Sequence, residues 1–283
     1  MTEKKLFENI LVPVDGSASS IAAEEMAASI AKKTASKVTV LHVRQEFSMH
    51  YNIPEMHGEL EGAVEQQADK IINSALALFS EEGVVAESQQ MTGEDPAETV
   101  LEFSEKNYDL IIMGVHGENE KDQYTLGSVT KKVITHTKLP ILITKKSPHL
   151  SSMLVCVDGS EQSITALELA VRLAGKLGSK VMLLNTQDQR LQKATPKVVE
   201  EVAEKIFSNA LAAVQKGKVE VQKKLEVGVP SDRIVEVAER GNYDLIVLGK
   251  RGLGRVKRFL LGSVSDDVIQ KAKTSVLLVP AET

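Results

Sequence analysis

An aspartate followed by Gly-Ser comes directly after a short apolar segment twice in the chain, as Asp15 and as Asp158. Later in each case come two glycines separated by two residues, and after nine more residues a Gly-Ser pair. The spacing G-x2-G-x9-G-S thus occurs twice, as Gly114, Gly117, Gly127 and Ser128, and as Gly249, Gly252, Gly262 and Ser263. Carboxylates beside glycine loops are groups that can contact a sugar and an anion.

The residue types of this pattern predict a nucleotide site. Glycines let backbone amides approach an anion without an intervening Cβ, and such amides form a concave nest. The final Gly-Ser opens a helical pattern whose first amides and dipole favour phosphate, and the two serines are expected to cap that helix. A carboxylate can accept hydrogen bonds from ribose hydroxyls. Two plainer interpretations stay open: the glycines as turn residues, and the aspartates as acceptors for turn amides.

The strands and helices that must position these residues belong to a sequence unit that occurs twice in the chain. Residues 10–17 return as residues 153–160 at an offset of 143, and residues 93–114 return as 228–249 at an offset of 135. The second copy is therefore eight residues shorter, and the loss lies between its second strand and its next helix. Short, β-branched apolar segments alternate with helical periods in both copies. In the first copy the predicted strands are Ile10–Val14, Val38–Val43, Val84–Gln90, Tyr108–Gly114 and Pro140–Thr144.

This alternation predicts two doubly wound α/β domains with parallel sheets, at residues 1–147 and 151–283. The join falls in residues 145–152, where Lys, Ser and Pro replace the apolar pattern. Asp95, Pro96 and Glu98 predict the start of a helix. Ligands of such folds bind beyond the carboxyl ends of the strands, where the strand order reverses. The aspartates and the glycine loops follow the first and fourth strands, so they are expected at that place.

Composition excludes several classes of protein. The 283 residues are 42% AVILMFWYC and 26% DEKR, as in globular proteins. The single cysteine, Cys156, rules out an intrachain disulfide and is expected to be a buried, inert thiol. A net charge of −5 argues against a nucleic-acid partner. No apolar run approaches the ~18 residues of a membrane span, so no membrane partner and a cytoplasmic location are expected. His50 and His57 lack a metal-ligand spacing, and no metal site is predicted.

Each half resembles a universal stress protein domain, and the whole chain is similar to a tandem universal stress protein. The resemblance is carried by VPVDGS and VCVDGS, by the doubled glycine motif, and by the short last strand after Leu139-Pro140 or Thr274-Ser275. It implies an adenine-nucleotide alpha-hydrolase-like fold with strand order 3-2-1-4-5. It also implies an internal pseudo-dimer in which residues 140–144 pair with residues 275–279, and a homodimer is a further expectation.

The resemblance also implies the ligand, ATP or another adenine nucleotide, with Mg²⁺ as a companion ion. The family's ATP-binding members hold ribose with the aspartate after the first strand, adenine near the end of the second strand, and phosphates on the glycine motif. On this chain the implied contacts of the second half are Asp158, Thr186, Gly249, Arg251, Gly252, Gly262, Ser263 and Val264. Those of the first half are Asp15, Val43, Gly114, Gly117, Gly127, Ser128 and Val129.

The two copies of the segment between the first glycine and the final Gly-Ser differ in net charge. Residues 115–126 carry Glu118, Glu120 and Asp122 against Lys121, a sum of −2. Residues 250–261 carry no acid, and their sum of +5 comes from Lys250, Arg251, Arg255, Lys257 and Arg258. Because cations near a phosphate raise its affinity, this difference predicts the tighter site in the second half, with Arg251 a better donor than the matching His116. The alternative is that these charges form a solvated helix face.

The function expected from this pattern is that of an adenine-nucleotide-binding regulatory protein with little or no catalytic turnover. A slow ATPase or self-phosphorylating enzyme is a second interpretation, in which Mg²⁺ places water or Ser263 near the γ-phosphate. It lacks an evident general base. A scaffold that binds no nucleotide is a third. A P-loop is absent from the sequence, and a phospho-receiver would need an aspartate where Gly93-Glu94 and Gly228-Val229 stand.

Overall fold

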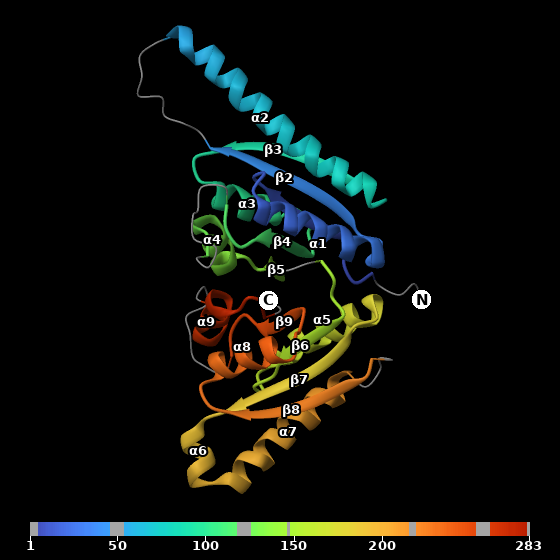
Figure 1. Ribbon diagram of the computed structural model, residues 1–283, viewed down its shortest axis with the longest axis vertical. Helices are drawn as coiled ribbons and strands as arrows, with labels where there is room; N and C mark the ends of the chain where they lie inside the picture. Colours follow the sequence, from blue (N-terminus) through green and yellow to red (C-terminus); the bar gives the residue numbers. More distant parts are fainter. Residues whose placement is uncertain are drawn as a thin grey trace.

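One ten-stranded sheet runs through the protein. The computed structural model describes residues 5–45, 54–117, 126–145, 148–214, 219–252 and 261–281. The strand order is β3-β2-β1-β4-β5-β10-β9-β6-β7-β8, so each half has five parallel strands in the order 3-2-1-4-5 (Figure 1). The predicted doubly wound fold is confirmed. The strands are β1 (Asn9–Val14), β2 (Lys37–Gln45), β3 (Ala86–Gly93), β4 (Leu110–Gly114), β5 (Ile141–Thr144), β6 (Ser152–Cys156), β7 (Lys180–Gln187), β8 (Val221–Val227), β9 (Leu245–Gly249) and β10 (Ser275–Val279).

Helices cover both faces of this sheet. One hydrophobic layer contains buried residues of α1, α2, α5 and α7, and the opposite layer contains those of α3, α4, α8 and α9. The helices are α1 (Ala18–Thr34), α2 (Pro54–Glu81), α3 (Pro96–Ser104), α4 (Ser128–His136), α5 (Glu161–Leu177), α6 (Gln189–Ala194), α7 (Pro196–Val214), α8 (Pro230–Arg240) and α9 (Ser263–Lys271). Because both faces are covered, the central strands are apolar almost throughout.

Alternate side chains of a central strand enter opposite layers. In β1, Ile10 and Val12 belong to the first layer and Leu11 to the second, and all three are fully buried. This follows from the two-residue period of a strand, which points successive side chains to opposite faces. A continuous apolar run in the sequence therefore supplies two cores at once.

Side-chain caps fix where several helices begin. Ser17 and Ser160 cap α1 and α5, and each accepts a hydrogen bond from the amide three residues ahead. Asp95 caps α3 by accepting from Ala97 N at 2.8 Å and Glu98 N at 3.2 Å, with Pro96 as the first helical residue. The helix start predicted from Asp95, Pro96 and Glu98 is confirmed, because a carboxylate satisfies amides that have no partner inside the helix.

The two halves meet along their last strands. β5 and β10 pair antiparallel, with Ile143 opposite Val276 and Ile141 opposite Leu278. The sheet is thus continuous across the junction, and Figure 1 shows the halves stacked along the long axis with this pair in the middle. The predicted pairing of residues 140–144 with 275–279 is confirmed, so the chain forms its own pseudo-dimer.

The connection between the second strand and the next helix is seven residues shorter in the second copy. Eight residues, 46–53, separate β2 from α2, whereas Asp188 alone separates β7 from α6. The 28-residue α2 of the first half corresponds to the pair α6 and α7, which is interrupted at Thr195-Pro196. Proline lacks the amide and crowds the preceding turn, so a continuous helix cannot pass through Pro196.

Candidate functional site

A cavity opens at the carboxyl ends of the parallel strands in each half. Its volume is about 630 Å³ in the first half and about 240 Å³ in the second. Each predicted contact residue lines the cavity of its own half. In the first half these are Asp15, Val43, Gly114, Gly117, Gly127, Ser128 and Val129. In the second half they are Asp158, Thr186, Gly249, Arg251, Gly252, Gly262, Ser263 and Val264.

The aspartate at the end of each first strand is held in a tight turn. Ser17 N donates to Asp15 Oδ1 at 3.0 Å, and Ser160 N donates to Asp158 Oδ1 at 2.9 Å. The glycine after each aspartate has a φ of +82° or +86°, which side chains rarely adopt. The interpretation of these carboxylates as acceptors for turn amides is therefore correct for Oδ1, and the same residues also line the cavities.

The second glycine of each loop lies against this carboxylate. A Cβ built on Gly117 would lie 2.7 Å from Asp15 Oδ2, and one built on Gly252 would lie 2.4 Å from Asp158 Oδ2. Both distances are shorter than real Cβ contacts, so a side chain at either position would have to displace the carboxylate. The absence of a side chain brings the carboxylate and the loop backbone into one small space.

The first glycine of each loop lines the cavity and also packs closely against neighbouring backbone. A Cβ on Gly114 would lie 2.3 Å from Ser19 Oγ and 2.6 Å from the Ser19 backbone, at the start of α1. In the second half, a Cβ on Gly249 would lie 2.9 Å from the Arg251 carbonyl oxygen and 3.2 Å from Gln162. The lack of a side chain at these glycines lets the end of the strand pack closely, and their predicted contact with an anion stays a prediction.

The helices that follow the glycine loops begin without a side-chain cap. Gly127 and Gly262 are the N-caps of α4 and α9, and neither helix start receives a side-chain hydrogen bond. The expectation that Ser128 and Ser263 act as caps is wrong, because they are already the first helical residues. Amides in the first turn have no acceptor within their own helix, so these ends carry partial positive charge towards the cavity.

The cap glycines themselves are engaged inside each loop. Gly127 N donates to Val115 O at 2.9 Å, and Gly262 N donates to Lys250 O at 3.0 Å. These two amides close the loop on itself, so they do not contribute to an anion nest in this conformation. The first turns of α4 and α9 begin at the cavities, and the dipoles of these helices favour an anion there.

A side chain from the second strand fixes the end of the first strand in both halves. His42 Nδ1 bonds the carbonyl oxygen of Val14 at 2.8 Å, and Asn185 Nδ2 donates to that of Val157 at 2.7 Å. His42 and Asn185 are matched at the offset of 143, so an imidazole and an amide make the same bond. Each holds the residue directly before the site aspartate.

Ser20 and Ser163 line the two cavities and were missed by the sequence-based argument. Ser20 Oγ accepts from Asp15 N at 3.3 Å, and Ser163 Oγ accepts from Asp158 N at 3.4 Å. The signal was present, because the two serines recur at the offset of 143. Arg44, Gln45 and Gln67 of the first cavity were also missed, and their second-half counterparts are not among the described residues that line the second cavity.

A buried carboxyl group lies behind the first site. Glu24 of α1 is 3% exposed and accepts from Ser20 Oγ at 3.0 Å. Burial raises the pKa of Glu24 to about 7, with smaller contributions from the negative charges of Asp15 and Glu25, while the Ser20 hydrogen bond opposes the rise. The matching residue of the second half is Leu167, which is also fully buried.

The positive charges that distinguish the second half do not all face its cavity. Arg251 lines the cavity, but Lys250 is 4% exposed and its Nζ donates to Thr137 O of the other half at 2.7 Å. The prediction that Lys250 adds charge to the anion site is therefore wrong. Arg255, Lys257 and Arg258 lie outside the described residues, as do the charged residues of the first segment, 118, 120, 121 and 122.

Cys156 ends β6 and lines the second cavity with a buried thiol. Burial raises the pKa of this thiol, and the nearby negative charge of Asp158 raises it further. Since the thiolate is the reactive form, this environment suppresses nucleophilic chemistry.

The described residues contain neither a metal-binding cluster nor a membrane-spanning helix. Within the described ranges, no group of three or more His, Cys, Asp or Glu side chains is arranged to hold a metal ion. His50 lies outside them, as does the side chain of His57. None of the helices in the described portion is long and apolar enough to cross a bilayer.

Comparisons with known proteins identify relatives of both halves. A model described as the universal stress protein family matches residues 6–145 and again residues 150–280. Universal stress protein MJ0531 from Methanocaldococcus jannaschii is 30% identical over 149 residues, which cover 50% of this chain and 85% of that protein.

Two solved structures extend the similarity over nearly the whole chain. A universal stress protein from Archaeoglobus fulgidus DSM 4304 is 26% identical with a TM-score of 0.74, and the match covers 99% of this chain and 100% of that one. Protein PA1789 from Pseudomonas aeruginosa PAO1, described as functionally unknown, shares the fold at 16% identity and a TM-score of 0.67, over 97% of this chain and 92% of that one.

Proposed function

Since this chain belongs to the universal stress protein family through both of its halves, we propose that it is a stress-associated regulatory protein that binds adenine nucleotides. Occupancy of the sites would change its conformation or its choice of partner. No described arrangement of a nucleophile and a general base supports substantial catalytic turnover. The proposal is thus a binding function and not an enzymatic one.

The observation that carries this proposal is the convergence of three groups on one cavity in each half. They are the carboxylate after the first strand, the glycine loop after the fourth strand, and the uncapped start of the next helix. A carboxylate accepts hydrogen bonds from ribose hydroxyls, and helix N-terminal amides favour phosphate. Val43 and Thr186 at the ends of β2 and β7 offer backbone groups that adenine can pair with.

We propose ATP or another adenine nucleotide as the ligand. In the second half Asp158, Thr186, Gly249, Arg251, Gly252, Gly262, Ser263 and Val264 would contact it, and in the first half Asp15, Val43, Gly114, Gly117, Gly127, Ser128 and Val129. Since no metal-binding cluster occurs among the described residues, any Mg²⁺ would arrive on the nucleotide phosphates.

Cavity size and charge predict different orders of nucleotide affinity for the two halves. The first cavity falls within the range of about 300–1,000 Å³ that is usual for small-molecule sites, and the second lies below it. Among the described residues, Arg251 is the cation that favours the second site. Because a ligand must fit before its charge counts, we propose the first half as the tighter of the two ATP sites, which reverses the ranking from charge alone.

Three further expectations from the sequence stay proposals. We propose domains at residues 1–147 and 151–283, a cytoplasmic location, and association of two chains into a homodimer. Limited proteolysis would test the domain boundary, because cleavage should concentrate between residues 147 and 151 if the division is right. Sedimentation would report the oligomeric state.

The direct experiment is the identification of small molecules released from the purified protein, followed by ATP titration calorimetry. An adenine nucleotide is expected in the released material, and apo protein is expected to bind ATP. Asp15→Ala and Asp158→Ala should each remove one site, and Asp188→Ala is a matched control because Asp188 lies outside both cavities. The absence of binding at millimolar ATP would refute the proposal and favour a scaffold.

A further inference from the structure

Two lysines cross the junction between the halves in opposite directions. Lys250 follows β9 of the second half, and its Nζ donates to Thr137 O of the first half at 2.7 Å. Lys145 follows β5 of the first half, and its Nζ donates to Ile269 O and to Ala272 O of the second half, the latter at 2.8 Å. Each ammonium group thus bonds the main chain of the other half.

The acceptors of the two lysines are equivalent positions. Thr137 is the C-cap of α4 and Ala272 is the C-cap of α9, and they are matched at the offset of 135. The donors are not equivalent, because Val115 occupies the position of Lys250 in the first half and Pro280 occupies that of Lys145 in the second. Lysines at two unrelated positions therefore make the same interaction: each places a positive charge at the negative C-terminal end of a helix at the junction.

The Lys250 side chain is buried and the Lys145 side chain is partly buried. Lys250 is 4% exposed, and burial lowers the pKa of both Lys145 and Lys250 to about 8. Arg251 adds a smaller electrostatic contribution in the same direction at Lys250. Both groups are mainly protonated at neutral pH, and the helix carbonyl oxygens compensate part of the cost of burying their charge.

Each lysine is also part of the backbone beside a candidate site. Lys250 N donates to Val279 O at 2.7 Å, and Lys250 O accepts from the cap glycine Gly262. Lys145 directly follows Thr144, which pairs with Gly114, the first glycine of the loop in the first half. The main chain of Lys250 thus supports the loop of the second site, and Lys145 follows the strand that flanks the loop of the first site, while its own amide donates to Ser275 Oγ of the second half at 3.0 Å.

The helix that each lysine holds begins at the opposite site. α4 and α9 have nine residues each, a length of about 13 Å, and their first residues line the cavities. A short helix moves as one body, so fixing its C-terminus also fixes the direction of its N-terminal amides. Preorganised donors bind a ligand more tightly than donors that must first be ordered.

We propose that Lys250 and Lys145 are positioning residues that make each nucleotide site depend on the opposite half of the chain. Lys250 links the loop of the second site to α4 of the first, and Lys145 links the first half to α9 of the second. Occupancy of one site then changes affinity at the other by a reciprocal factor. This inference rests on the proposed function.

The test measures one site at a time with ATP as the probe. Lys250→Met is made in an Asp158→Ala background, so that calorimetry reports the first site, and Lys145→Met is made in an Asp15→Ala background to report the second. We expect each change to weaken ATP binding in the opposite half by about three- to tenfold. Lys250→Arg keeps a charged donor and should largely restore affinity at the first site.

Hydrogen exchange adds a readout that needs no nucleotide. Lys250→Met should speed exchange of the α4 amides, although residue 250 belongs to the other half. Lys138→Met is the matched control, because Lys138 follows the same helix end but pairs with the exposed Glu105 at 3.1 Å. It should leave ATP affinity and α4 exchange unchanged.

The outcomes separate the two proposals. A folded Lys250→Met variant with unchanged affinity at the first site, or an equal loss in Lys138→Met, overturns the coupling alone. If Lys250→Met does not fold, Lys145→Met decides by the same criteria. Failure of the unmutated chain to bind ATP overturns the proposed function, and unchanged α4 exchange would then overturn the link between the halves as well.

Discussion

The carboxylate of Asp158 occupies the space that a side chain on residue 252 would need. A Cβ on Gly252 would lie 2.4 Å from Asp158 Oδ2, and the first half repeats the arrangement with Gly117 and Asp15 at 2.7 Å. The carboxylate after the first strand and the loop after the fourth strand are therefore in direct contact. A glycine at the second position of each loop therefore leaves the carboxylate in place.

Substitution of Gly252 is expected to disturb this contact. Gly252→Ala should displace the Asp158 carboxylate and lower ATP affinity at the second site by about tenfold, a change of about 1.4 kcal/mol in binding free energy. The measurement is ATP titration in an Asp15→Ala background. Gly62→Ala is the control, because nothing lies within 4 Å of a Cβ at Gly62 on α2. Unchanged affinity in Gly252→Ala would show that the carboxylate does not contact the ligand.

Glu24 should make stability depend on pH. Its pKa is about 7 in the folded chain, against an ordinary value of 4.5 for a glutamate, so between these pH values the folded state holds a proton that the unfolded state has released. The stability contributed by this group is full below pH 4.5 and is lost as pH rises through about 7. Glu24→Gln should remove this loss and raise the free energy of unfolding at pH 8 by about 2 kcal/mol.

Urea unfolding at pH 5 and pH 8 measures the effect of Glu24. The variant should differ from the parent mainly at the higher pH. Glu25→Gln is the matched control, since Glu25 is the exposed neighbour on the same helix. An equal difference at both pH values would mean that Glu24 is already ionised in the folded chain at pH 5.

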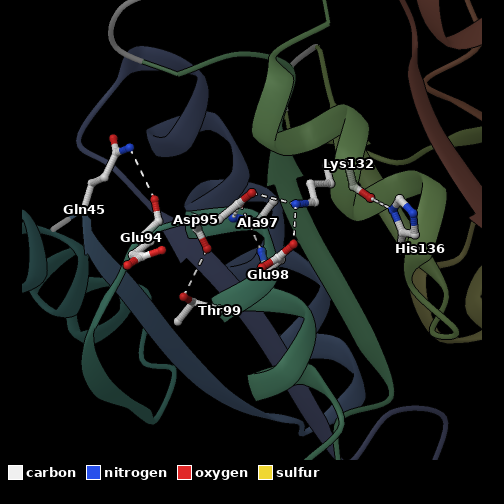
Figure 2. A network of polar contacts seen from close by, with 8 residues as sticks. All are labelled: Gln45, Glu94, Asp95, Ala97, Glu98, Thr99, Lys132 and His136. Carbon is white, nitrogen blue, oxygen red and sulfur yellow. Dashed lines mark hydrogen bonds and ion pairs between the residues drawn. The ribbon is translucent and has the colours of Figure 1, made fainter.

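The start of α3 combines a helix cap with an ion pair, and its two functions can be separated. Figure 2 shows Lys132 of α4 reaching Asp95 and Glu98, at 2.6 and 2.7 Å. The Lys132 ammonium lowers the pKa of Asp95 most, and the amides of Glu98 and Ala97 lower it further. Asp95→Ala should lose about 1 kcal/mol of stability with the cap.

Asp95→Asn keeps a capping side chain and removes the charge, so it should lose less stability than Asp95→Ala. Because the pKa of Asp95 is lowered, the contribution of its ionised form is present above the ordinary pKa and declines as the pH falls through the lowered one. Thermal unfolding at pH 7 and pH 3 measures both effects. Equal losses in the two variants would assign the whole contribution to the ion pair.

Cys156 should not react in the folded protein. Burial and the charge of Asp158 raise the pKa of its thiol, so little thiolate is present at neutral pH. A thiol reagent such as dithionitrobenzoate should label the native chain far more slowly than the urea-unfolded chain. Rapid labelling of the native protein would show that the reagent can reach the Cys156 thiol through the second cavity.

Much of the fold could be predicted from the sequence because its causes are local. The repeat, the apolar strands and the cap at Asp95 follow from hydrophobic periodicity and from groups within a few residues of each other. The candidate contact residues could also be found, because parallel strands end at the same edge of a sheet. Asp15 and Gly117 are distant in sequence and still line one cavity.

The remaining features, which the sequence did not predict, depend on contacts between segments that are distant in sequence. Lys250 is next to Arg251 in sequence, and only the packed junction turns its side chain to Thr137 of the other half. Likewise, the need for glycine at Gly114 comes from the start of α1, which a strand pattern does not reveal. Local chemistry determined what each segment is, whereas burial and hydrogen bonding between distant segments decided where each side chain points and how much room each site has.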